Sequence, residues 1–162
     1  MKLWKVVLCG DGGVGKTSLA RAFCEGVFNI NERLTVGVQH FVYSYDEKHK
    51  VVIWDLGGEE RFRFMAPMFL RGTRGALFVF DITREETFLS LDNWLKIFQD
   101  VVGDVPRVLV GNKVDLKEMR VVPTKVAEEY ARKKGFLHYV ETSARLNVNV
   151  DKAFILLLQH LR

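Results

Sequence analysis

Eight residues near the N-terminus have the types and the spacing that a polyphosphate-binding loop requires. Residues 10–17 read GDGGVGKT, which matches the pattern GxxxxGK[ST]. An apolar run typical of a buried strand precedes them at residues 3–9, and a helical pattern follows over residues 16–25. Glycines let backbone N–H groups surround the phosphates closely, and the positive end of the helix points at them. The loop therefore indicates a nucleoside triphosphate, without choosing between ATP and GTP.

Two side chains carry the chemistry of this loop. The Lys16 ammonium can reach the β- and γ-phosphates, and the Thr17 hydroxyl is a hard oxygen ligand suited to Mg²⁺. The residues that we expect to contact the nucleotide here are Gly12, Gly13, Val14, Gly15, Lys16, Thr17 and Ser18.

A second motif, NKxD at residues 112–115, follows an apolar strand expected over residues 106–110. The Asp115 carboxylate can accept two hydrogen bonds from guanine, one from N1–H and one from the N2 amine. Adenine offers neither donor, and a carboxylate left desolvated and unpaired costs roughly 1–3 kcal/mol. The stem of Lys113 can lie along the base, and Asn112 can tie the pocket to neighbouring segments. The motif favours guanine, and Asp115 argues against the alternative of an ATP-dependent kinase that shares the phosphate loop.

A third stretch, ETSAR at residues 141–145, follows an apolar strand expected over residues 136–140. The backbone amides of Ser143, Ala144 and Arg145 can donate to the guanine O6, because small residues let the chain approach the base closely. On its own the stretch is equally typical of a capped helix entry, so it gains its meaning from the other two motifs.

The elements that must position these motifs alternate along the whole chain. Apolar strands joined by amphipathic helices indicate a mostly parallel sheet covered on both faces, and ligands bind such sheets at the carboxyl ends of the strands. A polar turn at residues 46–49 predicts one hairpin, which adds an antiparallel edge strand. Strands are expected at residues 3–9, 36–45, 50–54, 76–80, 106–110 and 136–140, and helices at 16–25, 85–101, around 126–131, and from 150 to 158.

The composition limits the class of protein. The chain has 162 residues, 48% of them hydrophobic, and a net charge of +4, which fits one globular domain over residues 1–162. The basic excess is not clustered as a nucleic-acid footprint would be. The longest apolar run, residues 153–158, is far below the roughly 18 residues that a membrane span needs. No cysteine follows Cys24 to carry a prenyl group. We therefore expect a cytoplasmic monomer without a lipid anchor of its own, so that membrane association would require partners or a tail absent from this chain.

Taken together, the motifs resemble those of the Ras superfamily of small GTPases, nearest to its Rab and Ras branches. The resemblance covers essentially the whole chain: GDGGVGKT at 10–17, LTVGV at 34–38, WDLGGEERF at 54–62, GNKVD at 111–115 and ETSA at 141–144. It implies a P-loop NTPase fold, with a six-stranded mixed sheet and five helices on its two faces. It also implies a molecular switch that binds Mg²⁺ with GTP or GDP and hydrolyses GTP slowly.

The resemblance further assigns roles to residues outside the three motifs. It implies that Thr35 binds Mg²⁺ and senses the γ-phosphate, that Asp55 holds Mg²⁺ usually through water, and that Gly58 donates its N–H to the γ-phosphate. Phe28 corresponds to an aromatic residue against the guanine edge. Residues 28–38 and 57–72 correspond to two switch regions that contact effectors, an activating protein and an exchange factor. The implied metal ligands are Thr17, Thr35 and Asp55, and the implied catalytic residues are Lys16, Thr35, Gly58 and Glu59.

Glu59 departs from the family pattern, which has a glutamine that orients the attacking water. Glutamine both donates and accepts hydrogen bonds, whereas an ionised glutamate only accepts. Its charge would also stand near an anionic γ-phosphate. The alternative function is therefore a guanine-nucleotide-binding interaction module with negligible hydrolysis.

Overall fold

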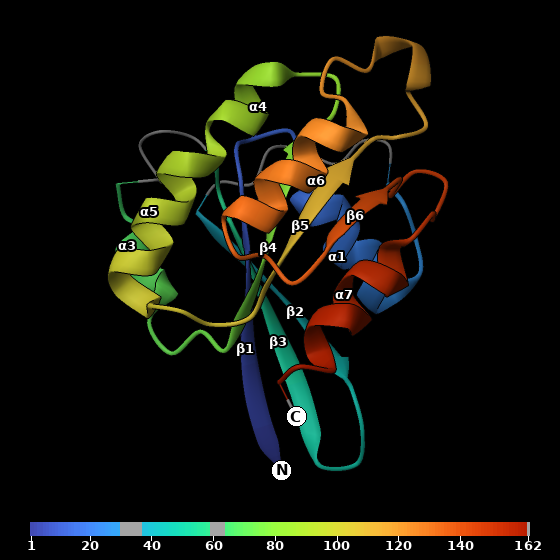
Figure 1. The fold of residues 1–162 in the computed structure, drawn as a ribbon. Coiled ribbons are helices and arrows are strands. Elements are labelled where there is room, and N and C mark those ends of the chain that lie inside the picture. Colours follow the sequence, from blue (N-terminus) through green and yellow to red (C-terminus); the bar gives the residue numbers. More distant parts are fainter. Residues whose placement is uncertain (30–36, 59–63, 162) are drawn as a thin grey trace.

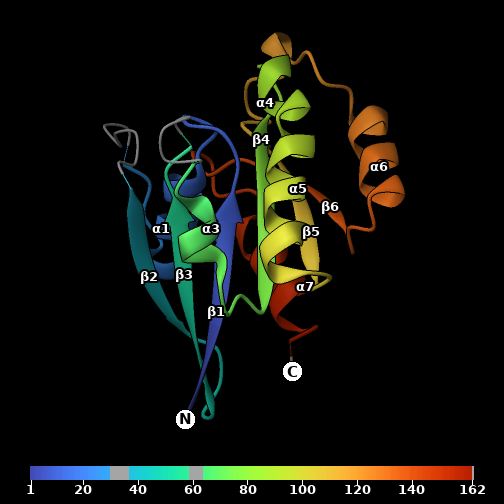
Figure 2. The same cartoon turned by 90° about the vertical axis from the view of Figure 1, so that its left-hand side faces the viewer.

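The structure, a computed structural model, describes residues 1–29, 37–58 and 64–161, and these contain one six-stranded sheet. The strand order across the sheet is β2-β3-β1-β4-β5-β6 (Figure 2). Strand β2 is antiparallel to β3, and every other neighbouring pair is parallel. The predicted sheet with one antiparallel edge strand is thus confirmed. The strands are β1 Lys2–Cys9, β2 Val38–Ser44, β3 His49–Leu56, β4 Gly75–Asp81, β5 Arg107–Asn112 and β6 Tyr139–Thr142.

Helices cover both faces of the sheet, as Figures 1 and 2 show. One face packs against α1 and α7, and the other against α3, α5 and α6. Helices α4 and α5 are separated by a single residue, so that the described chain has the predicted five helices when these two segments are taken as one. The segments are α1 Lys16–Glu25, α3 Ala66–Leu70, α4 Glu85–Leu89, α5 Leu91–Val102, α6 Thr124–Lys133 and α7 Val150–Leu158, with a 3-10 turn, η1, at Lys117–Met119.

Strand β1 shows how the two cores are built. Val6 and Leu8 point into the core beneath α1 and α7, whereas Val7 and Cys9 point into the core beneath α3, α5 and α6. This alternation follows from the period of two in a strand. Because all four residues are fully buried, β1 is held from both sides and its carboxyl end is a fixed starting point for the phosphate loop.

Most predicted elements differ by only a few residues at their ends, and two differ more substantially. The helix expected over 85–101 is interrupted at Ser90, whose Oγ donates to the Glu86 carbonyl at 2.9 Å while its N–H donates to the same carbonyl at 3.0 Å. Such a hydroxyl bond back to the preceding turn bends helices. The strand expected over 136–140 forms instead as β6, Tyr139–Thr142. Apolar character stops at Val140, so the pattern missed the polar end of this strand, Glu141 and Thr142, which pairs with β5 through its backbone.

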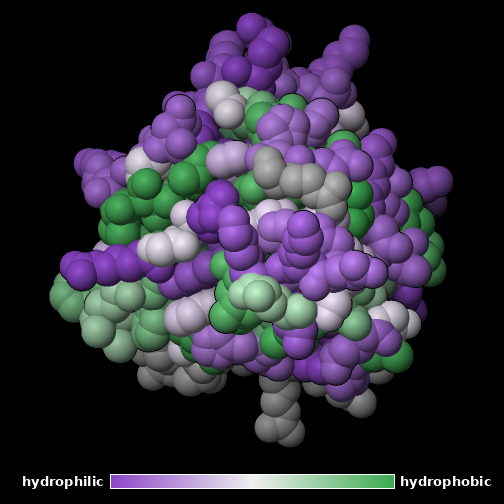
Figure 3. All heavy atoms as spheres, turned by 90° about the horizontal axis from the view of Figure 1, so that it is seen from below, coloured by the Kyte–Doolittle hydropathy of each residue, from purple (hydrophilic) through white to green (hydrophobic). Residues whose placement is uncertain are grey.

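After β1 the chain first builds β2 and β3 on one side of β1 within the sheet. It then crosses to the other side of β1 to form β4. A ligand crevice forms at the carboxyl end of a strand at such a switch point. In Figure 1 these carboxyl ends point upward, and both termini lie at the opposite pole. Figure 3 views that terminal pole, where hydrophilic and hydrophobic side chains are mixed. Within the described parts of the chain, no helix combines the length and the apolar character needed to cross a bilayer.

Candidate nucleotide-binding site

The phosphate loop joins β1 to α1 in a conformation that requires glycine. Gly15 lies immediately before α1 with φ of 100°, in the left-handed region that favours glycine. A Cβ at this position would also clash with the Asn112 side chain. The loop and the NKxD motif are therefore in direct contact, although 98 residues separate Asn112 from Val14.

Lys16 is buried, and its ammonium is directed at the loop itself. Nζ donates to the carbonyls of Gly10 at 2.8 Å and Asp11 at 2.9 Å. Burial lowers the pKa of Lys16, and the nearby carboxylate of Asp55 opposes that shift. The cation is thus held next to the loop, and an anionic ligand would favour its charged form.

Thr17 and Asp55 bring two oxygen donors together where α1 begins and β3 ends. The Thr17 hydroxyl donates to Oδ2 of Asp55, and both residues are buried. A hydroxyl and a carboxylate are the donors that Mg²⁺ accepts, and proteins usually supply only one or two such groups beside substrate phosphates. This pair fits the predicted metal site, whereas Thr35, the third predicted ligand, lies outside the described residues.

Gly58 follows β3 and lies directly against the phosphate loop. A Cβ at Gly58 would clash with the backbone of residues 10–12. Two predictions around it, the catalytic role of Glu59 and most of the first switch region, fall on residues that the structure does not describe, 59–63 and 30–36.

Asn112 connects the loop to the ETSA stretch. Its Nδ2 donates to the Val14 carbonyl at 2.9 Å. Its Oδ1 accepts from the Thr142 hydroxyl at 2.9 Å and from the Ala144 N–H at 3.4 Å. The side chain is 2% exposed, so each of its amide atoms is committed to holding one segment in place.

Lys113 and Asp115 occupy the same rim. Lys113 has φ of 74°, and its Nζ donates to the Gly13 carbonyl at 2.7 Å. Oδ1 of Asp115 accepts from the Ser143 hydroxyl at 2.9 Å, and that hydroxyl in turn accepts from the Leu146 N–H at 3.0 Å. The Asp115 carboxylate is therefore oriented by the loop that was predicted to face the guanine O6.

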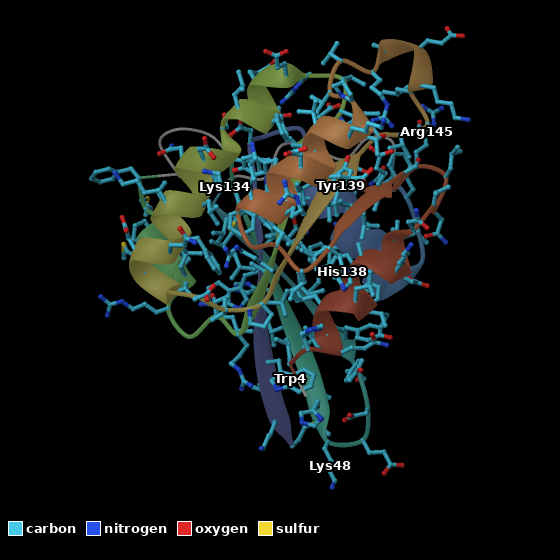
Figure 4. The ribbon with its side chains drawn as sticks, in the orientation of Figure 1. Trp4, Lys48, Lys134, His138, Tyr139 and Arg145 are labelled. Carbon is cyan, nitrogen blue, oxygen red and sulfur yellow. The ribbon has the colours of Figure 1, made fainter. Side chains whose placement is uncertain are left out.

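Glu141 is a residue of this rim that the sequence did not assign to any task. Its carboxylate accepts two hydrogen bonds from Arg120, at 2.8 and 2.9 Å, one from Tyr139 at 2.7 Å, and one from Thr124 at 3.0 Å. Burial raises the pKa of Glu141, but these donors outweigh it and the pKa is lowered overall. Figure 4 labels Tyr139 on β6 and Arg145 in the loop beyond it. Glu141 thus anchors the base of the loop that carries Ser143.

The remaining predicted residues are placed less tightly. Ser18 lies on α1 and is half-buried, and Arg145 is exposed. Phe28 follows α1 with 38% of its surface exposed. The structure therefore brings most of the predicted residues to one rim of the sheet, from the phosphate loop to Asp55 and Gly58 and on to Asn112, Asp115 and Ser143.

Comparisons with known proteins agree with this geometry. The sequence profile of the Ras family matches residues 5–162. Ras-related protein YPTC6 of Chlamydomonas reinhardtii is 42% identical over 156 residues, covering 94% of this chain and 72% of that protein. Ras-related protein Rab-21 of Dictyostelium discoideum is 39% identical over 158 residues, covering 95% and 74%. Ras-related protein RABA2a of Arabidopsis thaliana is 41% identical over 156 residues, covering 94% and 71%.

Proposed function

This chain belongs to the Ras family of small GTP-binding switch proteins, and from that premise we propose that it hydrolyses GTP slowly to GDP and phosphate. Proteins of this family bind GTP and GDP, generally with Mg²⁺, and are GTPases in general. We propose further that residues 28–38 and 57–72 contact effectors, an activating protein and an exchange factor. The whole chain would act as a single, monomeric nucleotide-binding domain in the cytoplasm.

The observation that carries the proposal is the junction of the phosphate loop and the base motif. Asn112 donates to Val14 at 2.9 Å, and Asp115 is held by Ser143 at the same distance. A phosphate cradle and a carboxylate able to accept from guanine N1–H and N2 thus lie on one rim. Adenine would offer that carboxylate neither of the two donors that guanine presents.

The chain's own groups would act mainly by position and charge. Lys16 would turn from the carbonyls of Gly10 and Asp11 to the β/γ oxygens, where its charge is neutralised by the ligand. Loop amides, together with the Gly58 N–H, would face the same oxygens. Mg²⁺, held by Thr17 and Asp55, supplies charge neutralisation at the phosphates when bound. Water would attack the γ-phosphate in line with the leaving oxygen.

Glu59 favours a second candidate, an interaction module that binds guanine nucleotide with negligible hydrolysis. An ionised carboxylate cannot donate a hydrogen bond to the anionic γ-phosphate as an amide can. This candidate shares the binding site and differs from the first only in the chemical step.

Two measurements test the proposals. Nucleotide released by denaturing the purified protein should be GDP or GTP, and an adenine nucleotide would contradict both candidates. A single-turnover assay with Mg²⁺ and GTP then separates them. Phosphate release above the rate in buffer supports the switch. Release at the buffer rate by the wild type, together with faster release by Glu59→Gln, supports the module.

A further inference from the structure

Side chains from outside the phosphate loop hold four consecutive residues of it. Two of these side chains, Asn112 and Lys113, belong to the base motif. The other two, Arg84 between β4 and α4 and Trp94 on α5, have no task in the proposed function. The four contacts are Trp94 Nε1 to Asp11 Oδ1 at 2.9 Å, Arg84 Nη2 to the Gly12 carbonyl at 3.0 Å, Lys113 Nζ to the Gly13 carbonyl at 2.7 Å and Asn112 Nδ2 to the Val14 carbonyl at 2.9 Å.

Asp81, at the carboxyl end of β4, forms ion pairs with the two cations in this set. Its side chain is 1% exposed, and its Oδ1 is fixed by the N–H and the hydroxyl of Thr83, at 2.8 and 2.6 Å. Its Oδ2 lies 3.0 Å from Nζ of Lys113 and 3.9 Å from Nε of Arg84. One buried carboxylate thus stands between two cations, each of which also donates to a carbonyl of the loop.

The direction of these carbonyls decides where the loop amides point. In a trans peptide the C=O of one residue and the N–H of the next are opposed. A donor that holds the Gly12 carbonyl outward therefore turns the Gly13 N–H the other way, and Lys113 and Asn112 do the same for the next two amides. These amides are the groups that a phosphate loop uses to bind its ligand.

We propose that Arg84, oriented by Asp81, is a positioning residue that aims the Gly13 amide of the phosphate loop at the nucleotide phosphates. The inference rests on the proposed nucleotide binding and adds a residue to it. Arg84 suits the task because a guanidinium offers several donors in a fixed plane. One of them binds Gly12, and Nε faces Asp81 and, at 3.5 Å, the exposed Glu86.

The test compares two ligands that differ by one phosphate. The affinity for GDP is obtained from association and dissociation rates of a fluorescent GDP analogue, and the affinity for GMP from its displacement. Replacing Arg84 with methionine keeps the length of the side chain and removes its donors. Arg84→Met is expected to weaken GDP binding roughly tenfold, equivalent to ~1.4 kcal/mol. GMP binding should change less than about twofold, because GMP lacks the phosphate that depends most on the loop amides.

Arg132→Met on α6 is the matched control, since that side chain is 72% exposed and pairs only with Glu129 in the described structure. It should leave both affinities unchanged, and Arg84→Lys, which keeps the charge and a donor, should restore most of the GDP affinity. If Arg84→Met does not fold, Arg84→Leu, which also lacks hydrogen-bond donors, replaces it in the same comparison. Equal losses for GDP and GMP, or no loss for GDP, would overturn the positioning role. A wild-type chain that binds neither ligand would instead refute the proposed function.

Discussion

The candidate site has two sides: a base side with Asn112 and Asp115, and a phosphate side with Lys16. The two sides differ in the internal contacts that their side chains make. On the base side, Asp115 and Asn112 are already bound by hydroxyls of the ETSA stretch, at 2.9 Å each. On the phosphate side, the Lys16 ammonium is bound to carbonyls of its own loop. The proposed base-reading side chains are therefore held in place without a ligand, whereas the proposed phosphate binding would exchange internal contacts of Lys16 for contacts with the ligand.

The largest effect is expected from removing the cation of the phosphate side. Lys16→Met should lower the affinity for GDP by roughly 10²–10³-fold, because charged partners in buried sites contribute about 2–5 kcal/mol. The nucleotide-free protein should not lose comparable stability. Burial lowers the pKa of Lys16, which means that the charged ammonium is unfavourable in the folded protein without a ligand. Fluorescent-GDP titration and urea unfolding measure the two quantities. Lys152→Met, at an exposed position of α7, is the control.

The next effect should change the ligand preference of the base side without touching the phosphate side. Asp115→Asn replaces a pure acceptor with one donor and one acceptor. Xanthine, which carries a carbonyl where guanine has its N2 amine, matches that pattern. The affinity for GDP should fall roughly 10–100-fold, and the affinity for xanthosine diphosphate (XDP) should rise. Each change corresponds to ~1–3 kcal/mol of binding free energy for the hydrogen bonds lost or gained. Competition between the two nucleotides measures the exchange, and a variant that still prefers GDP would show that Asp115 does not read the base.

A smaller, pH-dependent effect on the free energy of unfolding is expected at Glu141, which lies next to the base side. The pKa of Glu141 is lowered from its ordinary value of 4.5, because Arg120, Tyr139 and Thr124 together outweigh the effect of burial. Its contribution to stability is therefore complete above the unfolded-state pKa and is lost as pH falls through the lowered folded-state pKa. Glu141→Gln should cost roughly 1–3 kcal/mol at pH 7.

Urea unfolding between pH 7 and pH 3 checks this prediction. The difference in unfolding free energy between the wild type and Glu141→Gln should shrink as the solution becomes acidic. A difference that stays constant across this range would show that the contribution of Glu141 to the unfolding free energy does not depend on its charge.

The smallest effect is expected at Trp94. Trp94→Phe removes one hydrogen bond to Asp11 while keeping most of the buried ring, which corresponds to roughly 0.5–1.5 kcal/mol. GDP dissociation should become about twofold to tenfold faster. Trp4→Phe is the comparison, because Trp4 is equally buried but lies at the opposite pole (Figure 4). It should alter the unfolding midpoint and leave the dissociation rate unchanged.

The sequence predicted the sheet and the core of the candidate site because these depend on short, continuous patterns. The phosphate loop, for instance, is eight consecutive residues between an apolar strand and a helix. The contacts made by Arg84 and Trp94 could not be predicted in this way, since 72 residues separate Arg84 from Gly12 and 83 separate Trp94 from Asp11. The interruption at Ser90 coincides with a local hydroxyl bond to Glu86, which the helical periodicity does not reveal.

The contact between Gly58 and the phosphate loop has a mechanical consequence. The two backbones are so close that even a methyl group would not fit between them. Expansion of the loop must therefore push directly on the chain that leaves β3. A change in what the loop holds would therefore reach Gly58 by steric exclusion, which needs no intermediate hydrogen bond.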